Sequence, residues 1–137
     1  MKMGAKTKYK FPALIIKEDD GYVVEFPDLE DTFTDGATQE EAYENAEDVL
    51  NLMLWNREEN NIPIPKASSI DEIKVPENVT IALIQADTIE YRKRNDTKSV
   101  RKNVSIPSWL NTLAMKKNLN FSNLLQHALM NALGVEK

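Results

Sequence analysis

Hydrophobic and polar residues alternate along the first part of the chain in the manner of β-strands. The stretch YKFPALIIKEDDGYVVEFPD (residues 9–28) holds two apolar, β-branched runs on either side of EDDG (residues 18–21). An Asp-Gly pair between two such runs is typical of a tight β-hairpin. Because side chains alternate between the two faces of a strand, one face of the second run carries Tyr22, Val24 and Phe26.

The pattern becomes helical after a short third strand, which DTFTDG (residues 31–36) predicts. In ATQEEAYENAEDVLNLMLWNREENN apolar residues recur at i, i+4, i+7, i+8 and i+11, which indicates an amphipathic helix of roughly five turns. Thr38 and Glu41 fit a capping box at its start. The prolines of NNIPIPKASS end the helix. A further strand follows at NVTIALIQAD (residues 78–87); its middle is apolar on both faces, so we expect it at the centre of a sheet.

Charge then divides the chain into two modules. Residues 1–90 contain 8 Lys and Arg against 20 Asp and Glu, a balance of −12, whereas residues 91–137 contain 9 against 2, a balance of +7. Such asymmetry suggests two domains with different partners. The change falls in a polar stretch without periodicity, so we predict a domain over 1–90, a flexible linker over 91–98 and a second domain over 99–137.

The second domain is too small to be stable as a single copy. Its pattern predicts a strand over 99–106, a helix from Pro107 to about residue 117 and a helix over 121–133. A lone strand leaves hydrogen-bonding groups without partners, and two short helices do not enclose a core. We therefore expect a homodimer in which two copies of the strand pair antiparallel. The apolar face of the last helix would join the shared core: Leu124, Leu125, Ala128, Leu129, Ala132 and Leu133.

Composition offers little chemistry for an enzyme. The chain has no cysteine and one histidine, His127, which removes thiol catalysis and zinc-thiolate or histidine-cluster sites. No apolar run reaches the ~18 residues of a membrane span, and the lack of cysteine fits a cytoplasmic protein. Several aspartates could suggest a metal, but they flank turns, where aspartate is common. We expect neither a cofactor nor a catalytic or metal site.

The segment RKNVSIPSWLNTLAMKKNLNFSNLLQHAL resembles the ribbon-helix-helix family of bacterial DNA-binding dimers. The resemblance implies that a two-stranded ribbon enters the DNA major groove, with alternate side chains before Pro107 directed at the bases. Arginine can read guanine and asparagine adenine through bidentate hydrogen bonds. Lys102 stands where the family has an apolar residue, so we assign it to a phosphate instead. The expected DNA-binding residues are Arg101, Asn103 and Ser105 for bases, and Lys98, Lys102, Asn120 and Ser122 for phosphates, the last two at a helix N-terminus.

The first ninety residues resemble the N-terminal domain of HicB antitoxins. The resemblance rests on Pro27-Asp28 after the second strand, Gly36 with Thr38 before the helix, and a helix that begins Glu40-Glu41-Ala42. It implies an α+β protein: a truncated, non-catalytic RNase H-like β-β-β-α-β domain followed by a ribbon-helix-helix domain. It also implies a protein partner, the small basic RNA-cleaving toxin HicA, and operator DNA. The expected toxin-binding residues are Tyr22, Glu25, Asp28, Glu30, Asp31 and Asp35.

Two other functions are compatible with the sequence. One is a stand-alone ribbon-helix-helix repressor whose N-terminal domain senses a small molecule; an adjacent reading frame for a small basic protein would favour the antitoxin instead. The other is an RNase H-like nuclease, which requires acidic side chains that converge at the sheet. A toxin that binds RNA must be basic, because contacts to phosphates dominate RNA affinity. In the antitoxin interpretation the acidic N-terminal domain therefore binds a basic toxin. The dimers could also pair into tetramers.

Overall fold

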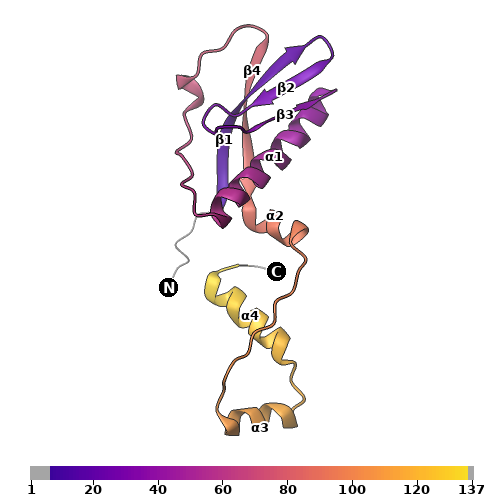
Figure 1. Ribbon diagram of the computed structural model, residues 1–137, viewed down its shortest axis with the longest axis vertical. Coiled ribbons are helices and arrows are strands. Elements are labelled where there is room, and N and C mark those ends of the chain that lie inside the picture. The colour runs from indigo at the N-terminus through magenta and orange to yellow at the C-terminus, as the bar shows by residue number, and fades with distance from the viewer. Residues whose placement is uncertain (1–6, 136–137) are drawn as a thin grey trace. The chain divides into compact units, whose positions relative to one another are not determined.

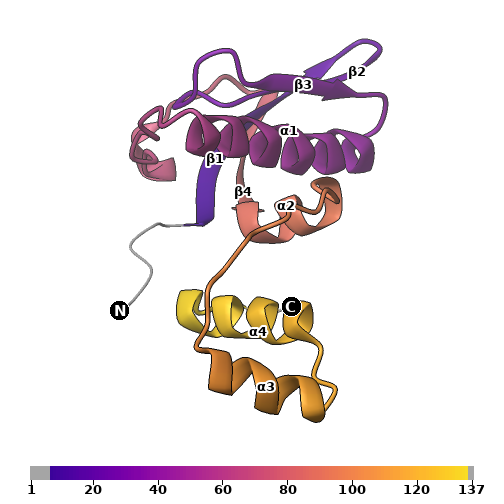
Figure 2. The same cartoon turned by 60° about the horizontal axis from the view of Figure 1, so that its bottom comes forward.

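The computed structural model describes residues 7–135 and divides the chain into two compact units, with the boundary between Thr97 and Lys98. The N-terminal unit contains a four-stranded sheet with a long helix on one face (Figure 1). The C-terminal unit contains two helices joined by a short turn (Figure 2). The elements are β1 (Lys8–Glu18), β2 (Gly21–Glu25), β3 (Phe33–Gly36), α1 (Gln39–Glu59), the 3-10 helix η1 (Ile70–Glu72), β4 (Val79–Asp87), α2 (Thr88–Asn95), α3 (Ser108–Lys116) and α4 (Phe121–Leu133).

The sheet has the strand order β3-β2-β1-β4 with every neighbouring pair antiparallel. The hairpin is confirmed, and its register pairs Ile15 with Val24. The predicted order of strand, strand, strand, helix and strand is confirmed as well. One expectation is wrong: β4 was predicted at the centre of the sheet but lies at an edge, and the interior strands are β1 and β2. Apolar residues on both faces of β4 thus did not indicate a central position, and Leu83 is 44% exposed.

The core lies between the sheet and α1. Every second residue of β1 from Tyr9 to Ile15 is buried, and each of these positions has a partner on β4 that faces the same side. Helix α1 contributes Ala42, Ala46, Leu50 and Leu54 to this core, so the predicted amphipathic helix is confirmed. Small residues at the first two of these positions let the helix approach the sheet closely.

The start of α1 shows why the sequence places glycine and threonine there. The Thr38 hydroxyl accepts a hydrogen bond from the Glu41 amide at 3.1 Å, and the Glu41 carboxylate accepts one from the Ala37 amide at 3.2 Å. A Cβ atom at Gly36 would lie 2.4 Å from the amide nitrogen of Ala42. Only glycine therefore allows β3 to run this close to the first turn of α1.

Helix α2 replaces the first part of the expected linker. The prediction of a flexible linker over 91–98 is wrong for its first five residues, because α2 extends to Asn95. The Asp87 side chain caps the helix by accepting a hydrogen bond from the Glu90 amide. Thr88 is fully buried and Tyr91 is 7% exposed, although the helix sequence TIEYRKRN has no apolar stripe.

Polar contacts hold α2 against the end of α1. The Arg92 guanidinium forms ion pairs with the carboxylates of Glu58, at 3.1 Å, and Glu59. Glu58 also accepts hydrogen bonds from the hydroxyls of Thr88, at 2.9 Å, and Tyr9, at 3.1 Å. Burial and the neighbouring Glu58 carboxylate raise the pKa of Tyr9 to about 12. Hydrogen bonds from Arg92 and the Trp55 indole lower the pKa of Glu59. The Glu58 carboxylate thus joins α1 to β1, through Tyr9, and to α2, through Thr88 and Arg92.

We predict that an N-terminal fragment must include α2 to be fully stable. Fragment 1–90 removes Tyr91, whose ring packs edge-on against Trp55 with centroids 5.7 Å apart, and also Arg92. Loss of one buried aromatic side chain costs about 3 kcal/mol, so fragment 1–90 should melt roughly 10 °C or more below fragment 1–97. Thermal unfolding followed by circular dichroism measures the difference. Equal melting temperatures would show that α2 does not contribute to this unit.

The C-terminal unit contains both predicted helices but no assigned strand. Residues 97–107 have no assigned helix or strand and run as an extended segment (Figures 1 and 2), and within residues 7–135 no other segment pairs with them. The β-element of the expected β-α-α unit is therefore absent from the single chain. The physical reason is that a strand is defined by ladder hydrogen bonds to a neighbouring strand, and no described segment supplies them to residues 97–107.

Candidate functional site

The C-terminal unit exposes the apolar side chains that a folded domain would bury. Neither α3 nor α4 contains a buried residue. On the extended segment Val104 is 67% exposed and Ile106 is 44% exposed. Isolated exposed leucines are normal. A unit in which every described apolar side chain is partly or fully exposed to solvent, however, has no hydrophobic core of its own. The exposed set on the helices includes Leu110, Leu113, Phe121, Leu124, Leu125, Leu129 and Leu133.

The predicted DNA-binding side chains lie on the extended segment in the expected alternation. Arg101, Asn103 and Ser105 occupy alternate positions and are exposed. In a β-strand this alternation would direct the polar set and the apolar set to opposite sides. Lys98 and Lys102 are also exposed. The segment therefore carries exposed polar side chains at alternate positions, with Val104 and Ile106 at the positions between and after them.

The first turn of α4 is a capped helix N-terminus that contains the predicted residues Asn120 and Ser122. Asn118 adopts a left-handed backbone conformation with φ of 56°, which turns the chain between the two helices. The Asn120 side chain then caps α4 by accepting a hydrogen bond from the Asn123 amide at 3.1 Å. Ser122 lies exposed in the same turn. Backbone amides in the first turn of a helix lack intrahelical partners and favour an anion such as phosphate.

The six predicted toxin-binding residues do not share one surface. Tyr22 lies on the face of the sheet that packs against α1 and contacts the core cluster. Asp28 is partly buried, and its carboxylate accepts hydrogen bonds from the Ser68 amide, at 2.9 Å, and from the Ser68 hydroxyl, at 2.5 Å. Asp28 thus fixes the connection between α1 and β4. Glu30 and Asp31 lie exposed in the loop between β2 and β3.

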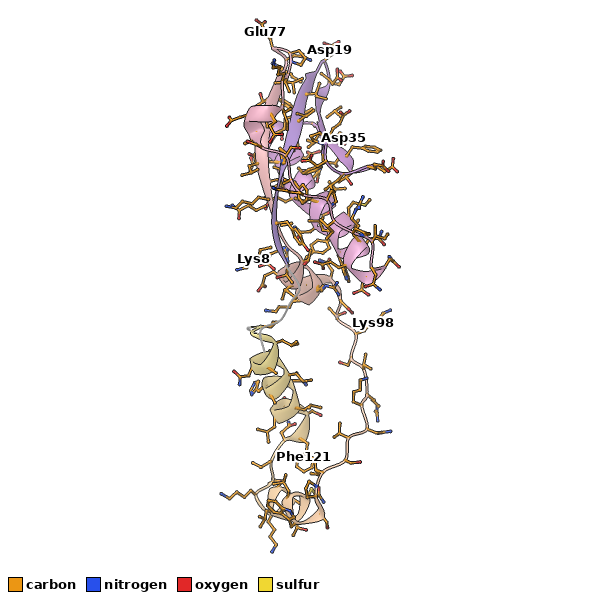
Figure 3. All side chains as sticks on the ribbon, turned by 90° about the vertical axis from the view of Figure 1, so that its left-hand side faces the viewer. Lys8, Asp19, Asp35, Glu77, Lys98 and Phe121 are labelled. Atoms are coloured by element: carbon orange, nitrogen blue, oxygen red, sulfur yellow. The ribbon has the colours of Figure 1, made fainter. Side chains whose placement is uncertain are left out.

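Glu25 and Asp35 lie together on the face of the sheet away from α1. Glu25 pairs with Phe33, and Val23 pairs with Asp35, so these four side chains are immediate neighbours. Phe33, which is 63% exposed, is not among the residues predicted from the sequence. The available signal was the spacing of Phe33 and Asp35, since residues two apart in a strand share one face and an aspartate favours exposure of that face. In Figure 3 Asp35 lies well away from Lys8, at the start of β1.

The acidic residues of the N-terminal unit do not form a catalytic or metal cluster in the part of the chain that the structure describes. Within residues 7–135 no group of three or more histidine or acidic side chains is placed to hold an ion. The convergent acids that a nuclease would need at the sheet are therefore not found there. A search of the same residues finds no helix with the length and apolarity of a membrane span.

Comparison with known protein families finds a family whose match extends over both units of the chain. The family described as the HicB-like antitoxin of bacterial toxin-antitoxin systems matches residues 11–128, from β1 into α4. The chain belongs to the HicB-like antitoxin family. Because HicB antitoxins are not enzymes, the expectation of a non-catalytic protein is confirmed by this membership. The match covers residues of both compact units.

Individual proteins and solved structures are also similar to this chain. An uncharacterized 14.9 kDa protein of Haemophilus phage HP1 is 28% identical over 103 residues, covering 73% of this chain and 74% of the phage protein. The antitoxin HicB of Burkholderia pseudomallei is 25% identical, with a TM-score of 0.52 over 91% of this chain and 98% of its own. A chain of a toxin-antitoxin complex from Streptococcus pneumoniae shares the fold, with a TM-score of 0.60, 24% identity, and coverage of 91% of this chain and 99% of that chain.

Proposed function

We propose that this HicB-like protein neutralises a small basic HicA-like toxin by direct binding through residues 7–97, and represses its own operon through residues 98–137. The family match across both units carries the proposal. The related fold in a toxin-antitoxin complex from Streptococcus pneumoniae supports a toxin as partner. The acidic balance of residues 1–90, −12, suits a basic partner and accelerates its capture.

Operator binding would require two copies of the C-terminal unit. Antiparallel pairing of two segments over residues 99–106 would supply the missing ladder and bring the apolar faces of four helices together. Arg101, Asn103 and Ser105 of both copies would then face the bases of the major groove. The basic balance of residues 91–137, +7, would contribute sequence-independent affinity for phosphates.

Co-expression with the adjacent reading frame tests the proposal. We expect growth arrest when a small basic product of that frame is induced alone, and normal growth when this chain is produced with it. Affinity purification of the chain should recover the product in a stable complex. A promoter-reporter fusion should fall in activity when the chain is present. Growth arrest despite abundant folded chain would contradict the antitoxin function.

A stand-alone repressor that senses a small molecule is the second candidate. An open cavity of about 640 Å³ in the N-terminal unit favours it, and the residues that line it include Lys8, Lys10, Glu47, Asn51, Glu90 and Arg94. Under this function the chain would have no toxin gene beside it, and its operator affinity would change with a charged small ligand. The presence of an adjacent toxin gene decides between the two candidates.

A further inference from the structure

The register of the sheet shows which side chains are neighbours on the face away from α1. One row across the strands is Phe33, Glu25, Leu14 and Ile81; the next is Asp35, Val23, Ile16 and Val79. This face is more apolar than the alternation of a solvent-facing sheet requires. Leu14, Ile16 and Val23 are half-buried, whereas Phe33, Glu25 and Asp35 on the β2–β3 side are exposed. Within these two rows the exposed side chains all lie on β2 and β3.

We call Val23, Glu25, Phe33 and Asp35 the Phe33 corner. Phe33 is the most exposed large apolar side chain in residues 7–97, at 63%. One exposed phenylalanine is unremarkable by itself, but here it lies diagonally across from the half-buried Val23 and adjoins two exposed carboxylates, Glu25 on β2 and Asp35 on its own strand. An aromatic anchor surrounded by polar groups is the usual anatomy of an interaction hot spot.

The edge of β3 is poorly suited to pairing with a strand of another protein. The strand has only four residues, and its Asp35 carbonyl oxygen already accepts a hydrogen bond from the Asn45 side-chain amide of α1 at 2.8 Å. Strand addition needs a row of available backbone groups. A partner at this corner must therefore be recognised through side chains, with Phe33 as the largest available contact.

Charge at the corner selects a basic partner. Glu25 and Asp35 belong to it, and Glu30 and Asp31 lie in the loop that leads into Phe33. On this face of the sheet the lysines of β1, Lys8 and Lys10, lie toward the start of that strand. Leu14, which pairs with Glu25, is four residues from Lys10, a separation of about 13 Å along an extended strand.

We propose that the Phe33 corner is the surface on which this protein holds its toxin. Phe33 inserts into an apolar pocket of the partner, while Glu25 and Asp35 pair with lysine or arginine side chains that the toxin uses to bind RNA phosphates. This inference rests on the proposed antitoxin function and narrows the acidic set expected from the sequence. Tyr22 and Asp28 are left with structural roles, the first in the core and the second at Ser68.

The test uses the full chain and the purified product of the adjacent toxin gene, with affinity measured by titration calorimetry. Phe33→Thr removes the ring but keeps a residue suited to a strand, and should weaken toxin binding about 30-fold or more, the loss typical of a hot spot. Leu83→Thr is the matched control, because Leu83 lies on the same face at the opposite edge and is 44% exposed. It should change the affinity less than about threefold, a value typical of residues outside a hot spot. Phe33→Trp should retain binding.

A second pair of variants tests the charges. Glu25→Lys and Asp35→Lys should lower the association rate and reverse its dependence on salt, since electrostatic attraction acts mainly on the rate of encounter. Melting temperature and mass in solution should match wild type for every variant, because all four substituted positions are exposed.

The outcomes separate this inference from the function on which it rests. Wild-type chain that fails to bind or neutralise the toxin overturns both. Wild-type chain that neutralises the toxin, with Phe33→Thr equally active, overturns the Phe33 corner alone. If Phe33→Thr instead lowers the mass of the chain in the absence of toxin and leaves toxin affinity unchanged, the occupant is a second copy of this chain and the inference is wrong.

Discussion

Val104→Asp and Leu125→Asp should each convert the protein into a monomer that no longer binds its operator. In the single chain Val104 is 67% exposed and Leu125 is 39% exposed, so neither substitution disturbs a core that already exists. In the dimer both positions would lie in the shared core, once per copy. Burying an unpaired carboxylate costs several kcal/mol, and the cost doubles across a two-fold axis. We expect operator affinity to fall by at least about 100-fold, which corresponds to roughly 3 kcal/mol.

Light scattering coupled to gel filtration reports the mass, and a mobility shift reports operator binding. Met115→Asp is the matched control: Met115 is 65% exposed, but it lies off the stripe of Leu110, Leu113 and Ala114 on α3. The control should remain dimeric and bind DNA. A Val104→Asp protein of wild-type mass would show that the extended segment does not contribute to the dimer core.

The elements that the sequence predicted well are those determined by local pattern. The β1–β2 hairpin follows from two apolar runs around an Asp-Gly pair, and α1 from its apolar spacing and its Thr38 cap. Both signals are contained in about twenty consecutive residues, so no knowledge of the remaining chain is needed to find them. The position of β4 depends on which strand pairs with β1, and local pattern does not contain that information.

Helix α2 shows the opposite case. Its sequence is charged and has no apolar period, so the sequence indicated a linker. The helix is held by partners 30 or more residues away: Arg92 on Glu58 and Glu59, and Tyr91 on Asp48 and the Trp55 ring. Tertiary contacts of this kind can override weak local preference, and they can be recognised only after α1 and α2 are placed side by side.

The candidate surfaces were predictable to different degrees. The alternation of Arg101, Asn103 and Ser105 with apolar residues could be read directly from the chain. The toxin surface could not, because the acids of the first ninety residues are numerous and only the sheet register shows which of them adjoin Phe33. Asp28 illustrates the difficulty, since its carboxylate binds Ser68, forty residues away in the sequence.

Asn103→Ala and Lys98→Ala should weaken DNA binding in two distinguishable ways. An asparagine at a base edge contributes to the operator and little to random DNA, so Asn103→Ala should cost about 1–3 kcal/mol per copy on the operator alone. A lysine at a phosphate contributes equally to every sequence. Lys98→Ala should therefore weaken operator and scrambled duplex alike and reduce the slope of log affinity against log salt by about one per copy.

Binding to both duplexes at several salt concentrations separates the two effects. The dimer presents each position twice, so a loss of about 1 kcal/mol per copy already changes the operator affinity roughly 30-fold. Asn103→Ala should thus lower the affinity for the operator toward that for scrambled DNA, with an unchanged salt slope. If Asn103→Ala retains the operator preference of wild type, the extended segment does not read the bases. The helices would then have to supply the contacts, and the exposed first turn of α4 at Asn120 and Ser122 would be the place to test next.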